Sequence, residues 1–505
     1  MKENYYSKIN DLSFFQESLN LYNSESIEDA NEAFITPTNA IDIQFNNNFD
    51  DDFVDISLQE IYSKESKNNN SSSKKTKKQK ESLSNDELAK ILIQSNQLIV
   101  LENVLHYWSE EEKRFIPLLG EAADRFIRQR IPNQYKKKIN QYSIKEIIQW
   151  LKSKKELKKE KTLSQQNNLV PFKNGVFDVN TYELYPHDSR YFFVNLINAA
   201  YPDENSYISG NHFEQFIYDI TGGNQELYDR LQELFGFVLS EIRDVKYIPF
   251  LVGAKDTGKS IVLKLLEYLV GEDSFTNLNF DQLNRPEYLA ELFGKKLNTC
   301  GELSEFKLNR LDNFKKLSGG DFVTARPIYE RPIKFINTAA LIFAGNHLPI
   351  INGIDKGNAF SGRLVIFPFN NPIPKENQDI NLFGKLTNET SYIAAWAMEG
   401  LSRWINNNYQ FTTCETIINL SNRYAEQSNS IENFIKKCCK FDTSLKIFKY
   451  EIEDAYQNYC NENGLATESS KLLQDHLKLN TRLTHCRFRK DGINKFGYIG
   501  LGIID

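Results

Sequence analysis

The sequence has few cysteines and no long apolar run. Its 505 residues include six cysteines, and no stretch approaches the roughly eighteen consecutive apolar residues that a membrane-spanning helix needs. The scarcity of cysteine excludes the disulfide-rich scaffolds of small secreted proteins. The amino terminus lacks the basic and then apolar pattern of a signal peptide. We therefore expect a cytoplasmic protein with reduced thiols and no membrane contact.

The sequence also lacks an excess of positive charge. Its net charge of -6 argues against a protein that coats nucleic acid with its whole surface, although a local basic groove or pore is compatible with it. The hydrophobic share of 40% and the aromatic share of 13% exclude a mainly disordered chain. At roughly 100–200 residues per domain, the length predicts about three folded domains.

The composition divides the chain into five predicted segments. Residues 1–62 are acidic and rich in asparagine, with no assigned role, and 63–87 are polar and basic. We predict that 63–87 form a flexible linker, with a nucleic-acid contact through the lysine-rich run 74–80 as the alternative. The predicted folded domains are 88–210, 211–430 and 431–505.

Local patterns predict several elements in these domains. Asn174-Gly175 lies between two β-type runs and predicts a hairpin turn. Apolar residues at helical spacing predict one helix that stops at Gly222-Gly223 and a second helix after it. Trp396 and Trp404 lie at helical spacing, so we expect them in the core.

One segment has the pattern of a phosphate-binding loop. Residues 253–260 fit G-x-x-x-x-G-K-[ST] between a predicted strand and a predicted helix, which is the context that this motif requires. Glycines let such a loop wrap phosphates with its backbone N–H groups. Lys259 would neutralise the β and γ phosphates, and the Ser260 hydroxyl would bind Mg²⁺. The residues predicted to hold ATP are Gly253, Thr257, Gly258, Lys259, Ser260 and Ile261.

A strand after this loop is predicted to carry an acid. Such an acid orients Mg²⁺ and the attacking water in phosphate-loop enzymes. Segment 295–305 is placed for this role, and we predict Glu302 as the acid and metal ligand, with Glu305 as the alternative. The strand is more polar than usual because it contains Asn298 and Thr299.

Two further residues complete the predicted catalytic set. Segment 335–344 is almost entirely apolar and predicts one strand buried on both faces. It ends just before Asn346, whose amide would then lie at the sensor position of a ring ATPase. Arg363 precedes another apolar strand. An arginine there can stabilise transition-state charge on the nucleotide of a neighbouring subunit, with a surface ion pair as the alternative.

The order of five motifs resembles the superfamily 3 helicases of the phage, plasmid and poxvirus primase-helicase type. The motifs are GAKDTGKS, CGELSE, KKLSGGDFVTARPIY, LIFAGNHLP and FSGRLVIFPF. The resemblance implies an α/β fold, in which an AAA+-like P-loop helicase domain follows an α+β helicase-associated domain. It also implies a homo-hexameric ring around DNA that translocates 3′ to 5′ with ATP and Mg²⁺. Lys259, Glu302, Asn346 and Arg363 would be its catalytic residues.

The resemblance also implies a biological setting. We expect a helicase that initiates replication of a phage, plasmid or genomic island in a bacterial cytoplasm, with other replication proteins of the host or element as partners. One alternative is an ATP-regulated origin-binding protein without unwinding activity. Another is a helicase-primase, which we disfavour because the first 87 residues contain no histidine for a primase metal site.

Two segments are predicted to contact DNA. The first, DFVTARPIYERPIKF, has two β-prone arms and would form a hairpin in the channel of the ring. Its candidate phosphate ligands are Arg326, Arg331 and Lys334. The second segment is the tail 431–505, where two helices precede a hairpin that turns at Asp491-Gly492.

The pattern of the tail is typical of a winged helix. In such a domain one helix enters a DNA groove and the hairpin contacts the backbone of single- or double-stranded DNA. The backbone ligands predicted here are Arg487, Arg489 and Lys490. A protein-docking surface is the alternative.

Overall fold

In the computed structural model the described residues are 84–137, 139–159, 168–203, 208–303, 307–308, 312–327, 332–351, 360–428, 430–463, 465, 467–479, 482–490 and 492–504. Three predictions lie outside them: the acidic segment 1–62, Glu305 and Arg331. The predicted linker 63–87 is described only from Ser84 onward. None of the described helices is long and apolar enough to span a bilayer.

The central element is a five-stranded parallel sheet. Its strand order is β15, β7, β13, β9, β8, and every neighbouring pair is parallel. The strands are β7 (Ile248–Gly253), β8 (Phe275–Thr276), β9 (Leu297–Leu303), β13 (Ala340–Gly345) and β15 (Leu364–Phe369). The predicted α/β class is therefore confirmed, and the sheet is parallel.

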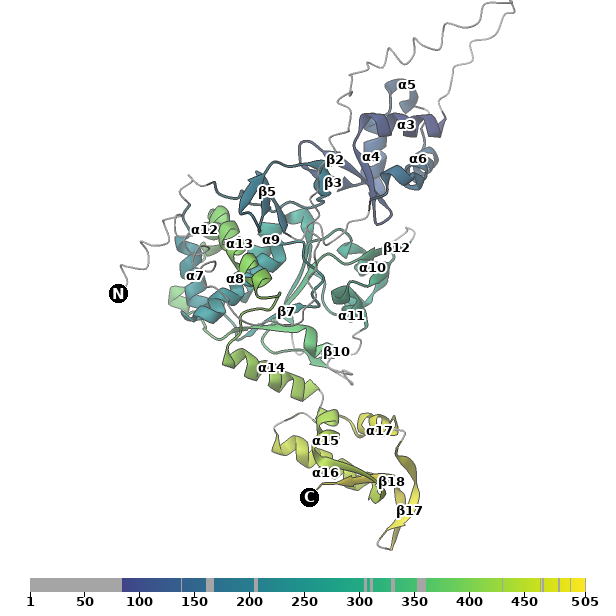
Figure 1. The fold of residues 1–505 in the computed structure, drawn as a ribbon, viewed down its shortest axis with the longest axis vertical. Coiled ribbons are helices and arrows are strands. Elements are labelled where there is room, and N and C mark those ends of the chain that lie inside the picture. The colour runs from purple at the N-terminus through teal and green to yellow at the C-terminus, as the bar shows by residue number, and fades with distance from the viewer. Residues whose placement is uncertain are drawn as a thin grey trace, which may run out of the picture. The chain divides into compact units, whose positions relative to one another are not determined.

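Helices cover both faces of this sheet (Figure 1). Helices α8 (Gln225–Leu239), α9 (Lys259–Val270) and α13 (Thr390–Asn406) share a core with one face, and α10 (Pro286–Leu289) and α11 (Asp312–Gly319) share a second core with the other. Successive strand residues point to opposite faces, so a strand covered on both sides must be apolar throughout. This explains why every position of β13 and β15 is buried.

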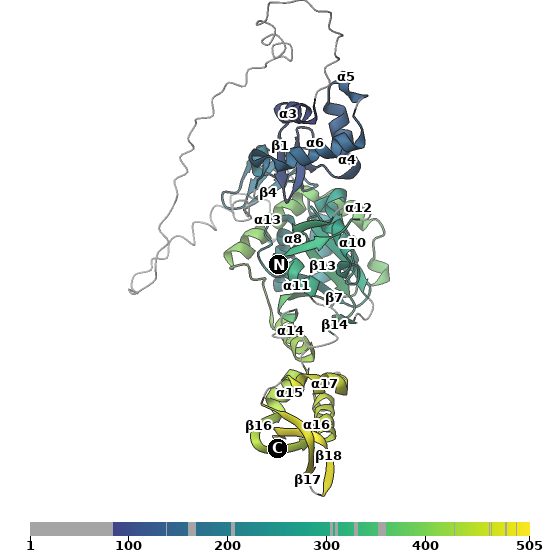
Figure 2. The same ribbon diagram turned by 90° about the vertical axis from the view of Figure 1, so that its right-hand side faces the viewer.

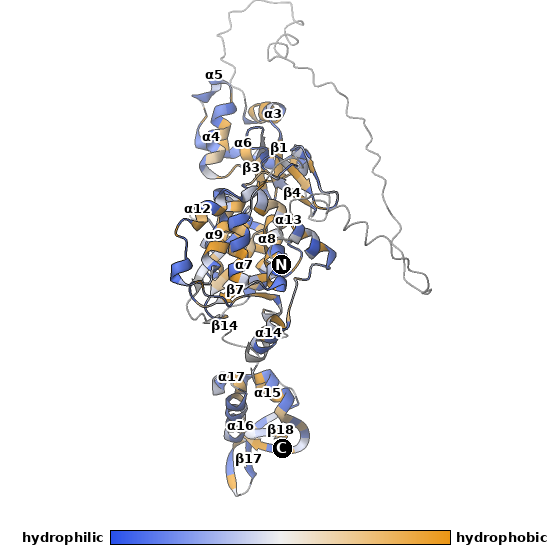
Figure 3. Ribbon diagram, turned by 90° about the vertical axis from the view of Figure 1, so that its left-hand side faces the viewer, coloured by the Kyte–Doolittle hydropathy of each residue, from blue (hydrophilic) through white to orange (hydrophobic). Residues whose placement is uncertain are grey.

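Three more helices flank the sheet region: α7 (Asn211–Thr221), α12 (Leu382–Thr387) and α14 (Glu415–Ser428). Helix α7 ends at Gly222, which adopts a left-handed conformation, and α8 begins at Gln225, as predicted. Trp396 and Trp404 are buried in α13, which confirms their predicted core position. Figure 3 shows hydrophobic residues along α8 and α9.

The chain ahead of α7 combines helices with antiparallel strands. Its helices are α3 (Asn85–Ser95), α4 (Gly120–Arg130), α5 (Asn133–Lys136) and α6 (Gln141–Ser153). Its strands form two sheets: β1 (Leu98–Leu101), β2 (Val104–Ser109) and β3 (Arg114–Pro117), then β4 (Leu169–Phe172), β5 (Gly175–Asp178) and β6 (Glu183–Tyr185). Helices α3, α4 and α6 share one apolar core with β1 and β2.

Two local predictions in this region are wrong by a few residues. Helix α3 begins inside the predicted linker, because Ser84 and Glu87 form a reciprocal capping box. In the β4–β5 hairpin Phe172 pairs with Gly175, so the turn is Lys173-Asn174 and lies one residue earlier than predicted. Gly175 is needed for a different reason, since a Cβ there would lie 2.6 Å from the Tyr185 carbonyl oxygen.

The predicted single strand 335–344 is also wrong, because it is divided in two. β12 (Ile333–Ile336) pairs with β11 (Phe322–Ala325) in an antiparallel hairpin, and β13 starts only at Ala340. The buried Asn337 side chain makes the break. Its Nδ2 donates to the Leu317 and Ala339 carbonyls at 3.1 and 2.8 Å, and its Oδ1 accepts from Ala339 N at 3.1 Å.

The tail has its own sheet and core. Its elements are α15 (Ser430–Cys438), β16 (Cys439–Phe448), α16 (Lys449–Glu462), α17 (Ser470–Lys478), β17 (Thr484–Lys490) and β18 (Ile493–Ile503). The antiparallel sheet has the order β16, β18, β17, and α15, α16 and α17 share its core (Figure 2). The two predicted helices and the hairpin turn are confirmed. The sequence reasoning missed β16, whose pairing with β18 is interrupted between Phe441 and Lys446.

Arg243 ties α8 to the amino ends of two central strands. Its guanidinium donates to five backbone carbonyls, those of Phe237, Val238, Ile242, Lys296 and Thr338, at 2.6 to 3.3 Å. Two of these carbonyls belong to the last turn of α8, that of Lys296 directly precedes β9, and that of Thr338 lies two residues before β13. Burial lowers the pKa of Arg243 to about 10, so the cation persists at neutral pH.

We predict that Arg243→Met lowers the free energy of unfolding by about 2–4 kcal/mol. Hydrogen bonds to a charged group contribute roughly 1.5–3 kcal/mol, and the carbonyls left behind would lack a donor. Urea unfolding followed by circular dichroism measures the change. Arg190→Met is the matched control, because Arg190 is exposed and pairs with Asp188 on the surface. Equal stability of the two variants would contradict the proposed role of Arg243.

Candidate functional site

The predicted phosphate-binding loop joins β7 to α9. β7 ends at Gly253 and α9 begins at Lys259, as the motif predicted. Gly258 has a φ of 90° and Asp256 a φ of 62°, so the loop makes two left-handed bends before the helix starts. The first N–H groups of a helix have no partner within the helix and attract anions. The loop thus leads directly into the N-terminus of α9, whose first N–H groups have no acceptor within the helix.

Two positions in this loop admit only glycine. A Cβ at Gly253 would lie 2.0 Å from the Phe369 carbonyl oxygen, which belongs to β15. A Cβ at Gly258 would lie 2.5 Å from Ile220 Cγ2 of α7. Both distances are far below van der Waals contact, and the second clash adds to an unfavourable φ. The sequence motif marks these glycines, but only the structure shows what each one avoids.

Lys259 is folded onto its own loop. Its Nζ donates to the carbonyls of Gly253 and Ala254 at 2.7 and 2.5 Å and to Thr257 Oγ1 at 3.1 Å. Partial burial lowers the pKa of Lys259, while nearby Asp256 opposes this shift. All three acceptors are neutral, so an anion would compete well for the ammonium.

The other predicted loop residues differ in exposure. Thr257 is buried and donates to the Ala254 carbonyl at 2.9 Å, so its hydroxyl stabilises the loop by an internal hydrogen bond. Ser260 is exposed, and Ile261 is half-buried. Only the Ser260 hydroxyl in this group is therefore accessible to a metal ion on the loop surface.

The register of the sheet brings three strand ends to the same edge. Gly345, the last residue of β13, pairs with Val252 of β7 and with Leu303 of β9. Asn346 follows directly and is exposed beside the loop. Glu302 is the last residue but one of β9, and its side chain is not among those described. Ligands of open parallel sheets bind at the carboxyl ends of the strands, which is where this edge lies.

Arg363 lies at the opposite edge of the sheet. It ends a short 3-10 helix, Ser361–Arg363, directly before β15. In the parallel pair of β15 and β7, Leu364 is level with Ile248 and Phe369 with Gly253. At about 3.3 Å per residue, the start of β15 is roughly 17 Å from the loop of the same chain. The structure therefore does not bring Arg363 together with Lys259 and Asn346.

Sequence reasoning missed the groups that support the loop. Ile220 and Phe216 of α7 lie against Gly258. Ile373 N donates to the Asp256 carbonyl at 2.8 Å, and Asn371 Nδ2 donates to the Ile220 carbonyl at 3.1 Å. The apolar spacing of α7 predicted a helix with a buried face, but no local signal indicated that this face meets the loop.

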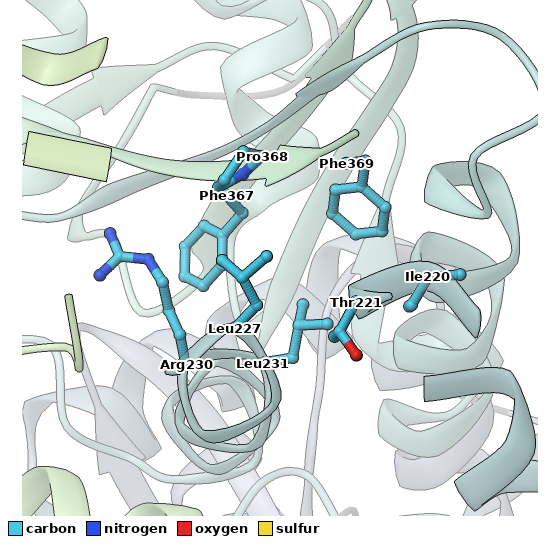
Figure 4. A pocket seen from close by; sticks show the side chains of 8 residues that line it. All are labelled: Ile220, Thr221, Leu227, Arg230, Leu231, Phe367, Pro368 and Phe369. Carbon is cyan, nitrogen blue, oxygen red and sulfur yellow. The ribbon is translucent and has the colours of Figure 1, made fainter. Parts of the chain in front are cut away.

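A small pocket lies behind this contact (Figure 4). It is lined by residues from α7, α8 and β15: Ile220, Thr221, Leu227, Arg230, Leu231, Phe367, Pro368 and Phe369. The Arg230 guanidinium is engaged by the carbonyls of Ile366 and Thr412 at 3.1 and 2.6 Å. The lining is mainly apolar, so this pocket is unsuited to hold phosphates.

The amino end of α7 is fixed by Glu389. One carboxylate oxygen accepts from Phe213 N at 2.8 Å, and the other accepts from His212 N at 3.2 Å and contacts His212 Nδ1 at 2.9 Å. A carboxylate at this end satisfies N–H groups that have no partner inside the helix and interacts favourably with the helix dipole. Helix α7 is thus anchored at its start by the residue before α13 and at its end by Asn371.

The predicted DNA ligands are basic and mostly exposed. Arg326 and Lys334 belong to the β11–β12 hairpin region, and Lys334 Nζ lies 4.7 Å from the centre of the Phe322 ring. In the tail Arg487 and Arg489 are exposed, whereas Lys490 pairs with Glu451 at 3.0 Å. Lys490 is thus held by its own domain. Within the described ranges, no group of three or more His, Cys, Asp and Glu side chains comes close enough to hold a metal ion.

The geometry of the loop generates a prediction for Gly258→Ala. The added methyl group would meet Ile220 and displace the loop from α7, so we expect the affinity for a fluorescent ATP analogue to fall at least about tenfold. The matched control is Gly294→Ala, because Gly294 also has a positive φ of 72° but has nothing within 4 Å of an added Cβ. Equal ATP affinity in the two variants would mean that the contact with Ile220 does not set the loop.

Comparison with known proteins identifies related families. Residues 57–222 match the family described as D5 N terminal like, and residues 251–363 match a family of unknown function, DUF5906. A putative helicase of Acanthamoeba polyphaga mimivirus, L207/L206, is 26% identical over 225 residues, which are 41% of this chain and 22% of the relative. The chain thus spans less than a quarter of that relative's length.

Similar solved structures include two of the apo C-terminal region of NrS-1. They cover 84% and 83% of this chain and 100% of their own, with 11% and 10% sequence identity and TM-scores of 0.42 and 0.43. The D5 N terminal like match and the mimiviral relative confirm the resemblance to helicases of the phage primase-helicase type that the motifs predicted.

Proposed function

We propose that this chain is an ATP- and Mg²⁺-dependent DNA helicase that acts in the replication of a phage, plasmid or genomic island. The observation that carries the proposal is the register of the parallel sheet, which places the loop 253–260, the end of β9 and Asn346 at one edge. The mimiviral relative named as a putative helicase supports the same class of activity. The proposed form is a homo-hexameric ring that translocates 3′ to 5′ on DNA.

Each residue at this edge has a role in the proposed reaction. The ammonium of Lys259 exchanges its three neutral partners for the β and γ phosphates of ATP. The Ser260 hydroxyl and the Glu302 carboxylate supply the hard oxygen ligands that Mg²⁺ prefers, and the ion would neutralise charge on the phosphates. Asn346 positions the attacking water from the neighbouring strand.

The position of Arg363 supports an oligomeric active site. Because it lies about five strand residues from its own loop, roughly 17 Å, it is not beside the phosphates of its own site and would act on the nucleotide of another subunit. In a closed ring the same contact repeats between every pair of neighbours. We therefore assign Arg363 as the arginine finger in trans.

Two surfaces would contact DNA. The β11–β12 hairpin would face the channel of the ring and bind phosphates through Arg326, Arg331 and Lys334. The tail has the element order helix, strand, helix, helix, strand, strand, and we assign it as a winged helix. Its hairpin would contact DNA through Arg487 and Arg489, with Lys490 limited by its pairing with Glu451.

The polar residues of β9 have a structural role, which weakens the alternative of a protein that binds ATP without hydrolysing it. The polarity of β9 left that alternative open. However, Asn298 Oδ1 accepts from Thr276 Oγ1 of β8 at 2.8 Å, and Thr299 Oγ1 donates to Glu267 of α9. These polar residues join β9 to its neighbours, so they need not reflect a lost catalytic function.

Lys259→Ala tests the proposed activity. Loss of the ammonium leaves the developing phosphate charge uncompensated, so ATP hydrolysis and unwinding of forked DNA should fall to background. Lys264→Ala is the matched control, because Lys264 is an exposed lysine of the same helix. Phosphate release and strand separation measure the two activities. Wild-type turnover in Lys259→Ala would disprove the loop assignment.

Arg363→Ala tests action in trans. The variant should bind ATP normally but lose about 10³-fold or more in turnover, as finger arginines do. Mixing it with Lys259→Ala subunits should restore part of the ATPase, since some interfaces would then combine an intact loop with an intact finger. The measurement is ATPase activity against mixing ratio. An activity that never rises above that of either variant alone would exclude the shared site.

A further inference from the structure

Near its turn, the β17–β18 hairpin of the tail has one face that its own domain does not cover. Farther from the turn the same face carries Tyr498, which is buried in the core of the tail. Residues directly opposite in an antiparallel pair lie on the same face. Arg487 is opposite Phe496, and Arg489 is opposite Asn494. All four residues are exposed. We call this set the outward face.

The other face of the hairpin is packed against its own domain. There Phe488 is buried and stacks on Phe448, with ring centres 5.0 Å apart and an interplanar angle of 6°. Lys490 pairs with Glu451 at 3.0 Å on the same side. Near the turn the two faces thus differ, because Phe488 and Lys490 contact their own domain whereas the residues of the outward face are exposed.

Phe496 is the main apolar group of the outward face. Its relative exposure is 54%, although aromatic side chains usually bury much of their large surface. The His485 ring lies on it at 5.7 Å with an angle of 17°, and the Arg487 guanidinium lies 5.8 Å from its centre. These neighbours hold the ring in place without covering it.

The charged side chains on the described strands of the hairpin are all basic, and Asp491 of the turn lies outside the described residues. The described residues of the hairpin, 484–490 and 492–503, contain Arg487, Arg489, Lys490 and Lys495 but no aspartate or glutamate. A single exposed phenylalanine is ordinary on a protein surface. An exposed aromatic ring between arginines, on a strand free of carboxylates, has the composition of a site for single-stranded nucleic acid.

We infer that the outward face is a stacking site for an unpaired DNA base, with Phe496 as the platform and Arg487 and Arg489 on the flanking phosphates. A base inside a duplex has both faces covered by its neighbours, so only single-stranded DNA or an opened end can stack on the ring. The tail would then bind the junction of single- and double-stranded DNA, beyond the backbone contact assigned to a wing. The inference rests on the proposed DNA-binding function of the tail.

The test compares Phe496→Leu with Phe496→Tyr in the full chain. Binding is measured without ATP, by fluorescence anisotropy, to a labelled oligothymidylate and to a blunt duplex of equal length. Loss of one base–aromatic contact corresponds to roughly 5- to 150-fold in Kd. We expect Phe496→Leu to lose this factor on single strands and to change less than about twofold on the duplex. Phe496→Tyr should retain wild-type affinity for both.

The matched control is Ile493→Ala. Ile493 is also an exposed apolar residue of the hairpin, but it pairs with Lys490 on the packed face. Its replacement should leave both affinities unchanged. The second measurement is the fluorescence of 2-aminopurine placed in the single strand. Binding should quench it in the wild type and in Phe496→Tyr but not in Phe496→Leu.

Two results would overturn the inference. If Phe496→Leu binds single strands like the wild type, no base stacks on Phe496. If its affinities for single strands and duplex fall equally, the face contacts both forms of DNA alike and is no stacking site for an unpaired base. Because no ATP is present, a wild-type protein that fails to hydrolyse ATP would refute the proposed helicase activity and leave this result intact.

Discussion

The contact between α7 and the loop 253–260 constrains much of the central region. Gly258 can pass beneath Ile220 only because it has no side chain, and the loop then bends directly into α9. The helix that imposes this limit is fixed at its first turn by Glu389 and at its last turn by Asn371. Groups before, within and after the sheet therefore set the backbone conformation of the loop together. A short glycine-rich segment that would be flexible alone is thereby held in one form.

The two edges of the parallel sheet differ in the groups that they carry, because the residues proposed to bind ATP lie at one edge and buried cations that stabilise the fold lie at the other. At its carboxyl edge lie the loop, Asn346 and the end of β9. At its amino edge Arg243 binds five carbonyls, and Lys296 donates to Glu241 at 2.7 Å and to the Ser240 carbonyl at 2.9 Å. The cations at the amino edge are occupied by fixed protein acceptors, whereas the three hydrogen-bond acceptors of the Lys259 ammonium among the described residues are neutral groups that a phosphate can replace. A lysine therefore stabilises the fold at the amino edge and is proposed to bind phosphate at the carboxyl edge, because its hydrogen-bond acceptors differ between the two edges.

Patterns within a few residues made most of the fold predictable. The loop motif, the stop of α7 at Gly222 and the tail hairpin all depend on local backbone preferences, and all three are in place. The failures depend on distant contacts. Asn337 interrupts an apolar run by bonding to Leu317, and Gly175 makes room for Tyr185 instead of turning the chain. The contact between Gly258 and α7 could not be predicted from the sequence of either segment, because it forms only when the helix packs against the loop.

The break at Asn337 also defines how two proposed surfaces are joined. β12 carries Lys334 on the hairpin, and β13 ends directly before Asn346 at the edge with the loop. Between them both polar atoms of the buried Asn337 side chain are hydrogen-bonded. Bending this joint would leave buried polar groups without partners, which costs about 1–3 kcal/mol for each group. The joint is therefore stiff, and the short segment 334–346 forms a rigid covalent link from the hairpin proposed to touch DNA to the edge proposed to hold ATP.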